Sequence, residues 1–235
     1  MTRRLITIRP EHGASLTVQA GRDSGLVVEP FPLFEIAAVD WNLPGGAFDG
    51  LLVGSANAMR LGGPNLDKLG GTPVYAVGEI TAAAAWERGF TTAAIGGGGL
   101  QAVLDDLGGK QLRLLRIAGE AHVPLIPPEG IEIVTAVAYR AEPKPVPPAR
   151  AELLDTGPVV LLHSAEAARH FAAEVDRLGL SRGGIALAAL APRIAEAAGP
   201  GWAASRAARQ PKDPALLALA REMCHEPFPG RDGRQ

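Results

Sequence analysis

The chain contains an internal repeat, which constrains its fold more than any other feature of the sequence. Each half carries the same succession of short apolar runs and small-residue turns. The matching segments are residues 5–13 with 112–120, 25–35 with 130–140, 48–58 with 158–167, and 74–89 with 185–199. Two similar α/β halves predict a cleft between them, and clefts between domains commonly hold small-molecule sites.

The composition is that of a globular protein with one large domain or two modest ones. The chain has 235 residues, of which 47% are hydrophobic, and this is enough to bury a core without disulfides. The single Cys224 cannot form an internal disulfide. No cluster of Cys and His in the sequence suggests structural zinc. We therefore expect a protein of the reducing cytoplasm with no bound metal.

The sequence lacks the features of a membrane protein or a nucleic-acid-binding protein. The apolar group near the N-terminus, residues 5–8, is far shorter than the roughly 20 residues of a spanning helix. The net charge is −2 and aromatic residues make up 5% of the chain, whereas nucleic-acid recognition usually requires a basic surface, often with aromatic side chains. We expect a soluble protein without a membrane or nucleic-acid partner.

Short apolar runs alternate with helical patterns along the chain. The runs are mostly bounded by Gly, Pro or charged residues, as expected of strands buried in a parallel sheet. They lie at residues 5–8, 26–29, 50–53, 74–77, 112–116, 132–137, 159–162 and 185–188. Ala, Leu, Glu and Arg recur at helical spacing in residues 81–88, 100–107, 165–178, 193–198 and 214–223. The alternation predicts an α/β fold with doubly wound parallel sheets and right-handed crossovers.

Extended segments indicate where the chain passes between domains. Residues 142–148 are proline-rich and fit neither a helix nor a central strand. A second connector is expected at residues 30–39. If both segments cross, two flavodoxin-like domains share a two-stranded extended connector. The domains are then residues 1–36 with 143–226, and residues 37–142, followed by a disordered tail at 227–235. Simple tandem domains with a break near residue 109 remain an alternative.

Five short motifs carry a resemblance to a known enzyme family. They are Arg9-Pro10, residues 54–58 (GSANA), residues 77–82 (VGEITA), residues 114–116 (LLR) and residues 137–140 (VAYR). In this order and at these spacings they resemble uroporphyrinogen-III synthase over nearly the whole chain. The resemblance implies an enzyme that binds linear hydroxymethylbilane between two α/β domains, removes water, inverts the terminal D ring and closes the macrocycle to uroporphyrinogen III.

The resemblance also implies a place in haem and tetrapyrrole biosynthesis. It implies a cytoplasmic monomer that uses no cofactor and no metal. The partner is a small molecule, the linear tetrapyrrole, and transient contact with the preceding enzyme of the pathway is expected.

Under this resemblance Tyr139 is the candidate catalytic residue. Loss of the hydroxyl from an electron-rich pyrrole gives a resonance-stabilised cation, so the protein has to supply mainly a proton donor at the leaving oxygen and a surface that folds the substrate. A phenol, with a reference pKa of about 10, stays protonated at neutral pH and can assist this step. The alternative is a connector tyrosine that packs at a domain boundary.

The substrate implied by the resemblance is a polyanion, which a nearly neutral protein has to bind with local features. Helix N-termini offer backbone N–H groups and the positive end of the helix dipole. The candidate substrate-binding residues at helix starts are Ser55, Ala56, Asn57, Thr81, Ser164 and Ala165. Ser and Thr are also preferred N-caps, so capping and binding can coexist there. Arg9 is the remaining candidate. It and Arg116, which the repeat makes equivalent at strand ends, are expected either to bind carboxylates or to form ion pairs.

Three other motifs favour a structural role. Residues 96–99 are four glycines, but they lack the Lys and Ser or Thr of a phosphate-binding P-loop. His163 and His170 have no third ligand nearby that would complete a metal site. His163 beside Ser164 does not form a catalytic triad, because adjacent residues at a strand end point apart.

Two other functions remain open at the level of the sequence. A non-catalytic anion-binding or regulatory module could use the same two-lobed fold, and so could a glycosyltransferase-like enzyme. The first would be favoured by a helix-turn-helix or a basic tail, and the second by a nucleotide-binding acidic residue or glycine turn. The sequence offers neither of these, apart from the four glycines.

Overall fold

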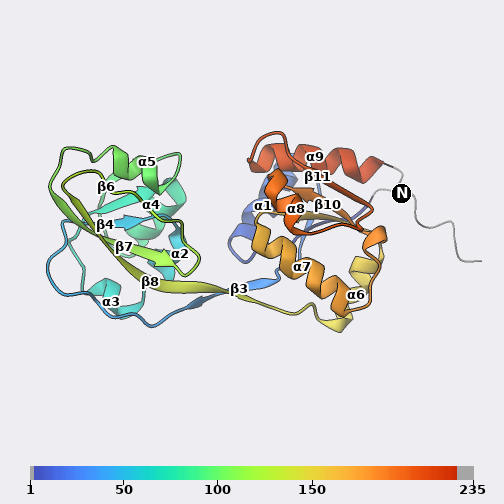
Figure 1. Ribbon diagram of the computed structural model, residues 1–235, viewed down its shortest axis with the longest axis horizontal. Helices are drawn as coiled ribbons and strands as arrows, with labels where there is room; N and C mark the ends of the chain where they lie inside the picture. The colour runs from blue at the N-terminus through green and yellow to red at the C-terminus, as the bar shows by residue number, and fades with distance from the viewer. Residues whose placement is uncertain (1–2, 227–235) are drawn as a thin grey trace, which may run out of the picture. The chain divides into compact units, whose positions relative to one another are not determined.

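The structure, a computed structural model, describes residues 3–226 of the chain. The tail predicted at residues 227–235 lies outside the described residues. The chain divides into two compact units (Figure 1). Unit 1 is formed by the segment that ends at Glu35 together with the segment that begins at Pro143, and unit 2 is Ile36–Glu142. The chain therefore passes from one unit to the other twice.

Unit 1 contains a five-stranded parallel sheet with helices on both faces. Its strands are β1 (Leu5–Thr7), β2 (Val28–Pro30), β9 (Val159–Leu162), β10 (Ala186–Ala189) and β11 (Ala204–Ala207), in the order β11-β10-β9-β1-β2. Its helices are α1 (Gly13–Asp23), α6 (Pro148–Asp155), α7 (Ala165–Arg177), α8 (Pro192–Ala197) and α9 (Asp213–His225), with a 3-10 helix at Arg182–Gly184. One face packs on α1 and α9 through a core that includes Leu5 and Leu217. The other packs on α7 and α8 through a core that includes Ile6 and Phe171.

Unit 2 contains a six-stranded sheet built on the same plan. Its strands are β3 (Phe34–Ala38), β4 (Gly50–Val53), β5 (Val74–Val77), β6 (Thr92–Gly96), β7 (Leu112–Gly119) and β8 (Ile131–Pro143), in the order β3-β8-β7-β4-β5-β6. Its helices are α2 (Ala56–Leu61), α3 (Gly63–Asp67), α4 (Glu79–Glu87) and α5 (Leu100–Asp105). Helices α2 and α4 pack on one face around Met59 and Ala85, and α5 packs on the other around Leu52 and Leu104. The predicted α/β fold with doubly wound parallel sheets is confirmed.

The strand orders show that the two halves have the same arrangement. The series β6-β5-β4-β7-β8 in unit 2 corresponds to β11-β10-β9-β1-β2 in unit 1. The register corrects one detail of the repeat. The capping residues Ser55 and Ser164 give the match between the two halves. Arg116 pairs with the residue three positions before Ser55, and Thr7 pairs with the residue three positions before Ser164, so Arg116 corresponds to Thr7. The prediction that Arg9 and Arg116 are equivalent is wrong by two residues, since short apolar strands align at several offsets and only the hydrogen-bond register selects one.

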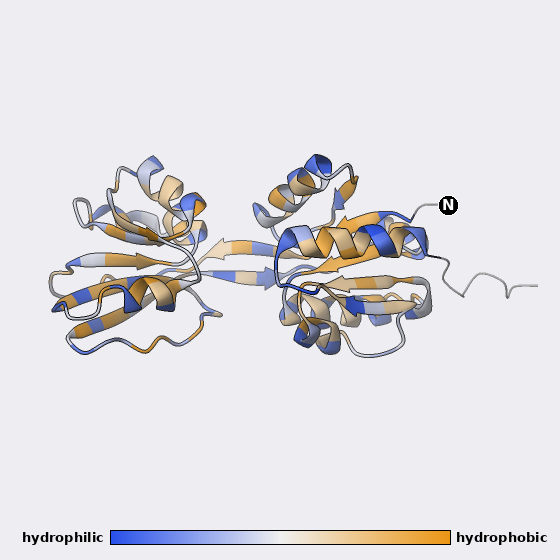
Figure 2. Cartoon of the chain, turned by 90° about the horizontal axis from the view of Figure 1, so that it is seen from above, coloured by the Kyte–Doolittle hydropathy of each residue, from blue (hydrophilic) through white to orange (hydrophobic). Residues whose placement is uncertain are grey.

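The buried strands are the ones that the sequence identifies. All eight predicted strands and all five predicted helices are present, with ends that shift by a few residues. Figure 2 shows the central strands mostly in the hydrophobic colour. The unpredicted strands β6 and β11 lie at the edges of their sheets, and most of their residues are exposed or half-buried. An edge strand needs no continuous apolar run, so its pairing partner determines it more than its own sequence does.

Candidate functional site

In each unit, helices begin at the carboxyl ends of parallel strands, the edge at which open α/β sheets commonly bind ligands. Ser55 follows β4 and caps α2, with its hydroxyl accepting a hydrogen bond of 3.2 Å from the N–H of Asn57. Ser164 follows β9 and caps α7, accepting a bond of 3.1 Å from the N–H of Ala167. The two serines are therefore N-caps, as predicted, and each satisfies one free donor of its helix.

The residues after these caps differ in how accessible they are. Ala56 is 7% exposed, and its methyl group belongs to the hydrophobic core of unit 2. Asn57 and Ala165 are half-buried. Glu166 is exposed in the first turn of α7 and adds a negative charge at that helix start. An incoming carboxylate can approach α7 more easily than α2, but it meets an acidic neighbour there.

Thr81 does not start a helix, contrary to the prediction. Helix α4 begins at Glu79, after Gly78, which has a φ of 76° and caps the helix without a side chain. Thr81 is 4% exposed, and its N–H donates a hydrogen bond of 3.2 Å to the carbonyl of Gly78. A glycine in the left-handed region places the helix start two residues earlier than a hydroxyl cap would.

Tyr139 lies on β8 beside Gly119 of β7, where the register between the two strands shifts. A Cβ atom at Gly119 would lie 2.6 Å from Cε2 of Tyr139 and 3.1 Å from its hydroxyl oxygen, so the ring fills the space that a side chain would need. The half-buried ring packs against the core of unit 2. Its hydroxyl forms no hydrogen bond to any of residues 3–226. The phenol is thus held in place by packing and is available as a donor.

Arg9 lies just after β1 and forms an ion pair within unit 1. Its Nη1 donates to Oδ2 of Asp213 at 3.1 Å and to Oγ1 of Thr17 at 3.2 Å. A Cβ atom at Gly13 would lie 2.7 Å from Nε of Arg9, so the glycine at the start of α1 leaves room for the guanidinium. Of the two alternatives for Arg9, the ion pair is present in the structure.

Asp213, the first residue of α9, also faces His163 at the end of β9. Nε2 of His163 lies 3.3 Å from Oδ1 of Asp213, but both ring nitrogens are buried without a well-aligned hydrogen bond. The contact with His163 is the largest cause that lowers the pKa of Asp213, and the charge of Arg9 and the hydroxyl of Thr17 act in the same direction, while burial opposes them. Sequence reasoning missed Asp213. Its only signal was an acid at the start of a predicted helix.

Unit 2 has no counterpart of this polar cluster. With the repeat aligned by register, Gly54 and Leu100 occupy the positions of His163 and Asp213. The end of β4 and the start of α5 lie close together in the same way, since a Cβ atom at Gly54 would lie 3.5 Å from Cδ2 of Leu100. This contact is apolar. Arg116 lies inside β7 and not after it, and it is 7% exposed. The prediction that placed it at the end of a strand was therefore wrong.

A hollow of about 440 Å³ lies at the opposite edge of the unit 2 sheet, at the amino ends of β7 and β8. Its arginine, Arg113, is engaged within unit 2 through Nε and Nη1. The side chain pairs with Glu132 at 3.1 Å and donates to the carbonyls of Gly45 and Ala47. Because these donors are used internally and the hollow is also lined by Asp49 and Glu132, it is a poor candidate for the binding of an anionic ligand.

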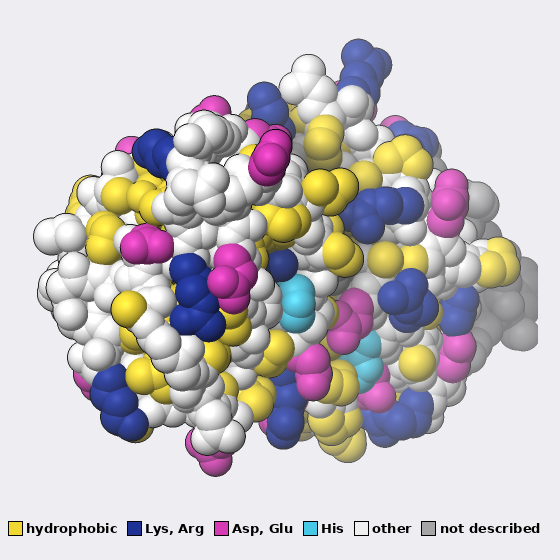
Figure 3. All heavy atoms as spheres, turned by 60° about the vertical axis from the view of Figure 1, so that its left-hand side comes forward, with side chains coloured by type: hydrophobic (Ala, Val, Ile, Leu, Met, Phe, Trp, Pro, Cys, Tyr) yellow, Lys and Arg dark blue, Asp and Glu magenta, His cyan; other side chains and the backbone are white. Residues whose placement is uncertain are grey.

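The described part of the chain offers no metal centre and no spanning helix. Within residues 3–226, no three side chains of His, Cys, Asp or Glu are placed to hold a metal ion. No helix in that range has the length and apolar character needed to cross a bilayer. On the face shown in Figure 3, acidic and basic side chains are interspersed. This face offers no broad positive patch for an anionic ligand, so individual groups such as the helix starts are the candidates for its binding.

A family model and several solved structures are similar to this chain. A family model described as uroporphyrinogen-III synthase HemD matches residues 15–218. The solved structure of uroporphyrinogen-III synthetase from Helicobacter pylori is similar with a TM-score of 0.62 and 18% identity, over 94% of this chain and 99% of that one. Uroporphyrinogen III synthase from Thermus thermophilus aligns with a TM-score of 0.41 and 16% identity, over 96% of this chain and 100% of that one. A comparison with curated proteins finds no match. The Helicobacter pylori structure has the same two-sheet α/β fold.

Proposed function

Since the chain belongs to the uroporphyrinogen-III synthase HemD family, we propose that it converts hydroxymethylbilane into uroporphyrinogen III, a step of tetrapyrrole biosynthesis. The reaction removes one water, inverts the D ring and closes the macrocycle. The observation that carries the proposal is the family match over residues 15–218, which includes segments of both units. The substrate is a linear tetrapyrrole with carboxylate side chains.

Tyr139 is the proposed proton donor. As the bond between the terminal methylene carbon and the hydroxyl oxygen breaks, the phenol donates its proton to the departing oxygen and water leaves. The cation that remains is stabilised by the electron-rich pyrrole. The proton released when the new carbon–carbon bond has formed and the pyrrole becomes aromatic again can restore the phenol. The packing of the ring over Gly119 and the unengaged hydroxyl support this role.

The start of α7 is the proposed carboxylate contact of unit 1. Ser164 caps this helix of 13 residues. The N–H groups of the next two residues have no acceptor within the helix, so they can bind an anion. Ala165 leaves these N–H groups partly open to a ligand. The start of α2, at Ser55 and Asn57, is the corresponding contact of unit 2. Buried Thr81 contributes only indirectly, by packing in the first turn of α4. Arg9 adds a positive charge at the same edge of the unit 1 sheet.

Product analysis tests the proposal. The purified protein is incubated with hydroxymethylbilane, and after oxidation the uroporphyrin isomers are separated. We expect the type III isomer in excess of the type I isomer that forms without an enzyme. Tyr139→Phe is expected to lower kcat about tenfold with little change in Tm, because one general acid contributes roughly 10²–10⁴-fold and water can partly replace it. The matched control is Tyr75→Phe, since Tyr75 is the other tyrosine of the chain and is buried on β5.

Two results would count against the proposal in different ways. Type I isomer alone from the folded wild-type protein would remove the synthase activity. If that protein still bound uroporphyrin, the chain would be a non-catalytic anion-binding module. Wild-type rates in Tyr139→Phe, together with normal isomer selection, would leave the function in place and remove Tyr139 from the mechanism.

A further inference from the structure

Arg116 is a buried arginine without a counter-charge. It lies in the middle of β7 and is 7% exposed. Its Nε is buried and has no hydrogen-bond partner, and within residues 3–226 its guanidinium forms no ion pair. Burial lowers the pKa of Arg116, and Tyr139 on the neighbouring strand opposes this shift. A buried charge without a partner is strongly unfavourable, so such a residue is unusual in a folded protein.

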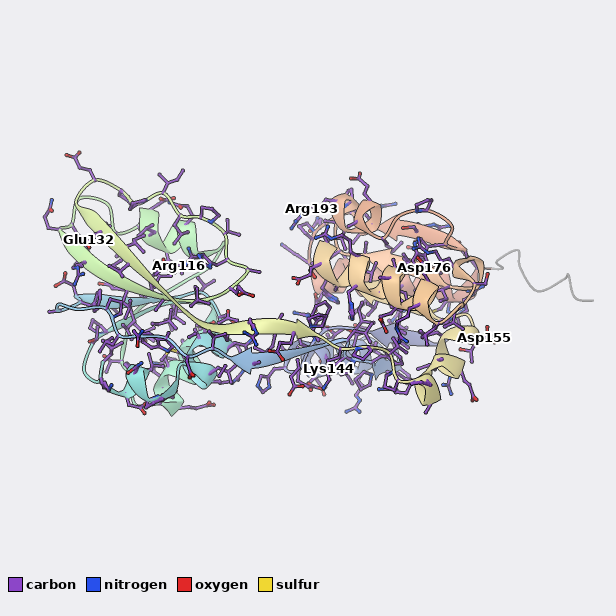
Figure 4. The ribbon with its side chains drawn as sticks, turned by 60° about the horizontal axis from the view of Figure 1, so that its bottom comes forward. Arg116, Glu132, Lys144, Asp155, Asp176 and Arg193 are labelled. Atoms are coloured by element: carbon purple, nitrogen blue, oxygen red, sulfur yellow. The ribbon has the colours of Figure 1, made fainter. Side chains whose placement is uncertain are left out.

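Eight other arginines within residues 3–226 form ion pairs. Ion pairs join an arginine to an acid even at exposed positions, as for Arg113 with Glu132 and Arg182 with Asp176. The most deeply buried arginine is left unpaired. Figure 4 labels Arg116 and Glu132 within unit 2 and shows them well apart. The acid that pairs with Arg113 is therefore no partner for Arg116.

The helix start above Arg116 differs between the two units. The residue that matches Arg116 in unit 1 is Thr7, and the paired arginine of unit 1, Arg9, lies two positions further along the chain. In unit 1, the arginine at the end of β1 receives its carboxylate from Asp213, the first residue of α9. In unit 2, α5 takes the place of α9 and begins with Leu100. Arg116 lies on the same face of its sheet as α5, because Leu114, two residues earlier, packs in the core that α5 covers. The start of α9 thus supplies a carboxylate in unit 1, and the start of α5 supplies none in unit 2.

We propose that Arg116 is the anchor of an anion site in unit 2, and that its counter-charge is a carboxylate of the bound ligand. The planar guanidinium donates in pairs and matches a carboxylate better than any other side chain does. Resting on the proposed function, the ligand group is an acetate or propionate arm of the tetrapyrrole. A free inorganic anion has the same chemistry, and the experiment separates these two sources.

The experiment compares Tm and ligand affinity in the wild type, Arg116→Met and Arg116→Lys. Without ligand, Arg116→Met is expected to raise Tm by about 3 °C or more, because it replaces an unpaired buried charge with an apolar chain of similar length. With uroporphyrin as the probe, its Kd is expected to rise about tenfold in Arg116→Met, which corresponds to the loss of one charge-assisted contact. Arg116→Lys keeps the charge but loses the paired donors, so its Kd is expected to rise by a smaller factor.

Arg113→Met is the matched control. It removes one positive charge from the same strand, but it breaks an ion pair at the surface. We expect this variant to lower Tm and to leave the Kd of uroporphyrin unchanged. The free-anion source is tested with sodium phosphate and sodium propionate, each against sodium chloride at equal ionic strength. If both salts raise the Tm of the wild type but not of Arg116→Met, the site binds free anions. If only uroporphyrin does so, the site binds a side arm of the ligand.

The proposal fails if Arg116→Met and Arg116→Lys, both folded, bind uroporphyrin with the wild-type Kd. Its failure is distinct from failure of the proposed function. A wild-type protein that makes the type III isomer, with unchanged kcat and KM in Arg116→Met, keeps the function and loses the anion site. A wild-type protein without synthase activity whose uroporphyrin affinity depends on Arg116 keeps the anion site and loses the function.

Discussion

Replacing Asp213 with Asn tests the polar cluster that unit 1 has and unit 2 lacks. The carboxylate lies 3.1 Å from Arg9, 3.4 Å from Thr17 and 3.3 Å from His163. The amide of Asn has a similar shape, but it removes the charge that these groups face. We expect Asp213→Asn to destabilise unit 1 while leaving its fold intact.

The expected loss follows from the burial of the carboxylate. The side chain of Asp213 is 30% exposed. Its ion pair therefore lies between two limits: a surface pair contributes about 0–1 kcal/mol, and breaking a fully buried pair costs about 3–5 kcal/mol. We therefore expect the free energy of unfolding to fall by about 2 kcal/mol. For a chain of this size, about 2–4 °C of Tm corresponds to each kcal/mol, so Tm should fall by about 4–8 °C.

The loss should depend on pH in a defined direction. The pKa of Asp213 in the folded protein lies below the ordinary value of 3.8. A lowered carboxyl pKa means that the stabilising charge is fully present above about pH 4 and is lost as the pH falls through the folded-state pKa. The difference in Tm between the wild type and Asp213→Asn should therefore be full at pH 6–7 and shrink below about pH 4.

The assay follows thermal unfolding through Trp202, the tryptophan of unit 1, which stacks on Phe171. Trp41→Phe and Trp86→Phe in the background remove the signal of unit 2. The matched control is Asp176→Asn, which breaks an arginine pair whose carboxylate is 57% exposed, so its loss of stability should be clearly smaller than that of Asp213→Asn. Equal losses in the two variants, or a loss from Asp213→Asn that does not shrink between pH 6 and pH 3, would refute the reasoning.

Three further outcomes are expected. Gly119→Ala should lower kcat more than Gly97→Ala does. The new Cβ atom at residue 119 would lie 2.6 Å from the ring of Tyr139, whereas a Cβ atom at residue 97 meets no atom within 4 Å. Similar kinetics for the two variants would contradict the placement of the phenol. Ser164→Ala should cost about 1 kcal/mol of unfolding free energy, measured by denaturant titration, because it removes the cap of α7; an unchanged midpoint would mean that the cap is dispensable. Ala165→Asp should raise KM for hydroxymethylbilane more than Ala165→Asn does, because only the former repels a carboxylate at the α7 start; equal KM values would exclude this start as a carboxylate site.

The amino-acid sequence determines the architecture of each unit. Its apolar runs mark the buried strands of both sheets, because a strand covered on both faces has no alternative to apolar residues. The serines at residues 55 and 164 mark two helix starts, since capping is a local interaction between residues two or three positions apart. The repeat indicates that two similar units exist, and the two sheets have matching strand orders.

Only the tertiary structure decides which of these residues meet. The start of α4 is shifted from Thr81 to Glu79 by the backbone conformation of Gly78, which the residue type permits but does not dictate. The equivalence of Arg116 with Thr7 depends on strand register, which a repeat of short apolar runs leaves open.

The pairing of Arg9 with Asp213 joins residues 204 positions apart, and the lack of a counter-charge for Arg116 is a property of everything packed around it. Local interactions are written in neighbouring residues, whereas the pairing or isolation of a charge depends on the three-dimensional arrangement of the whole unit.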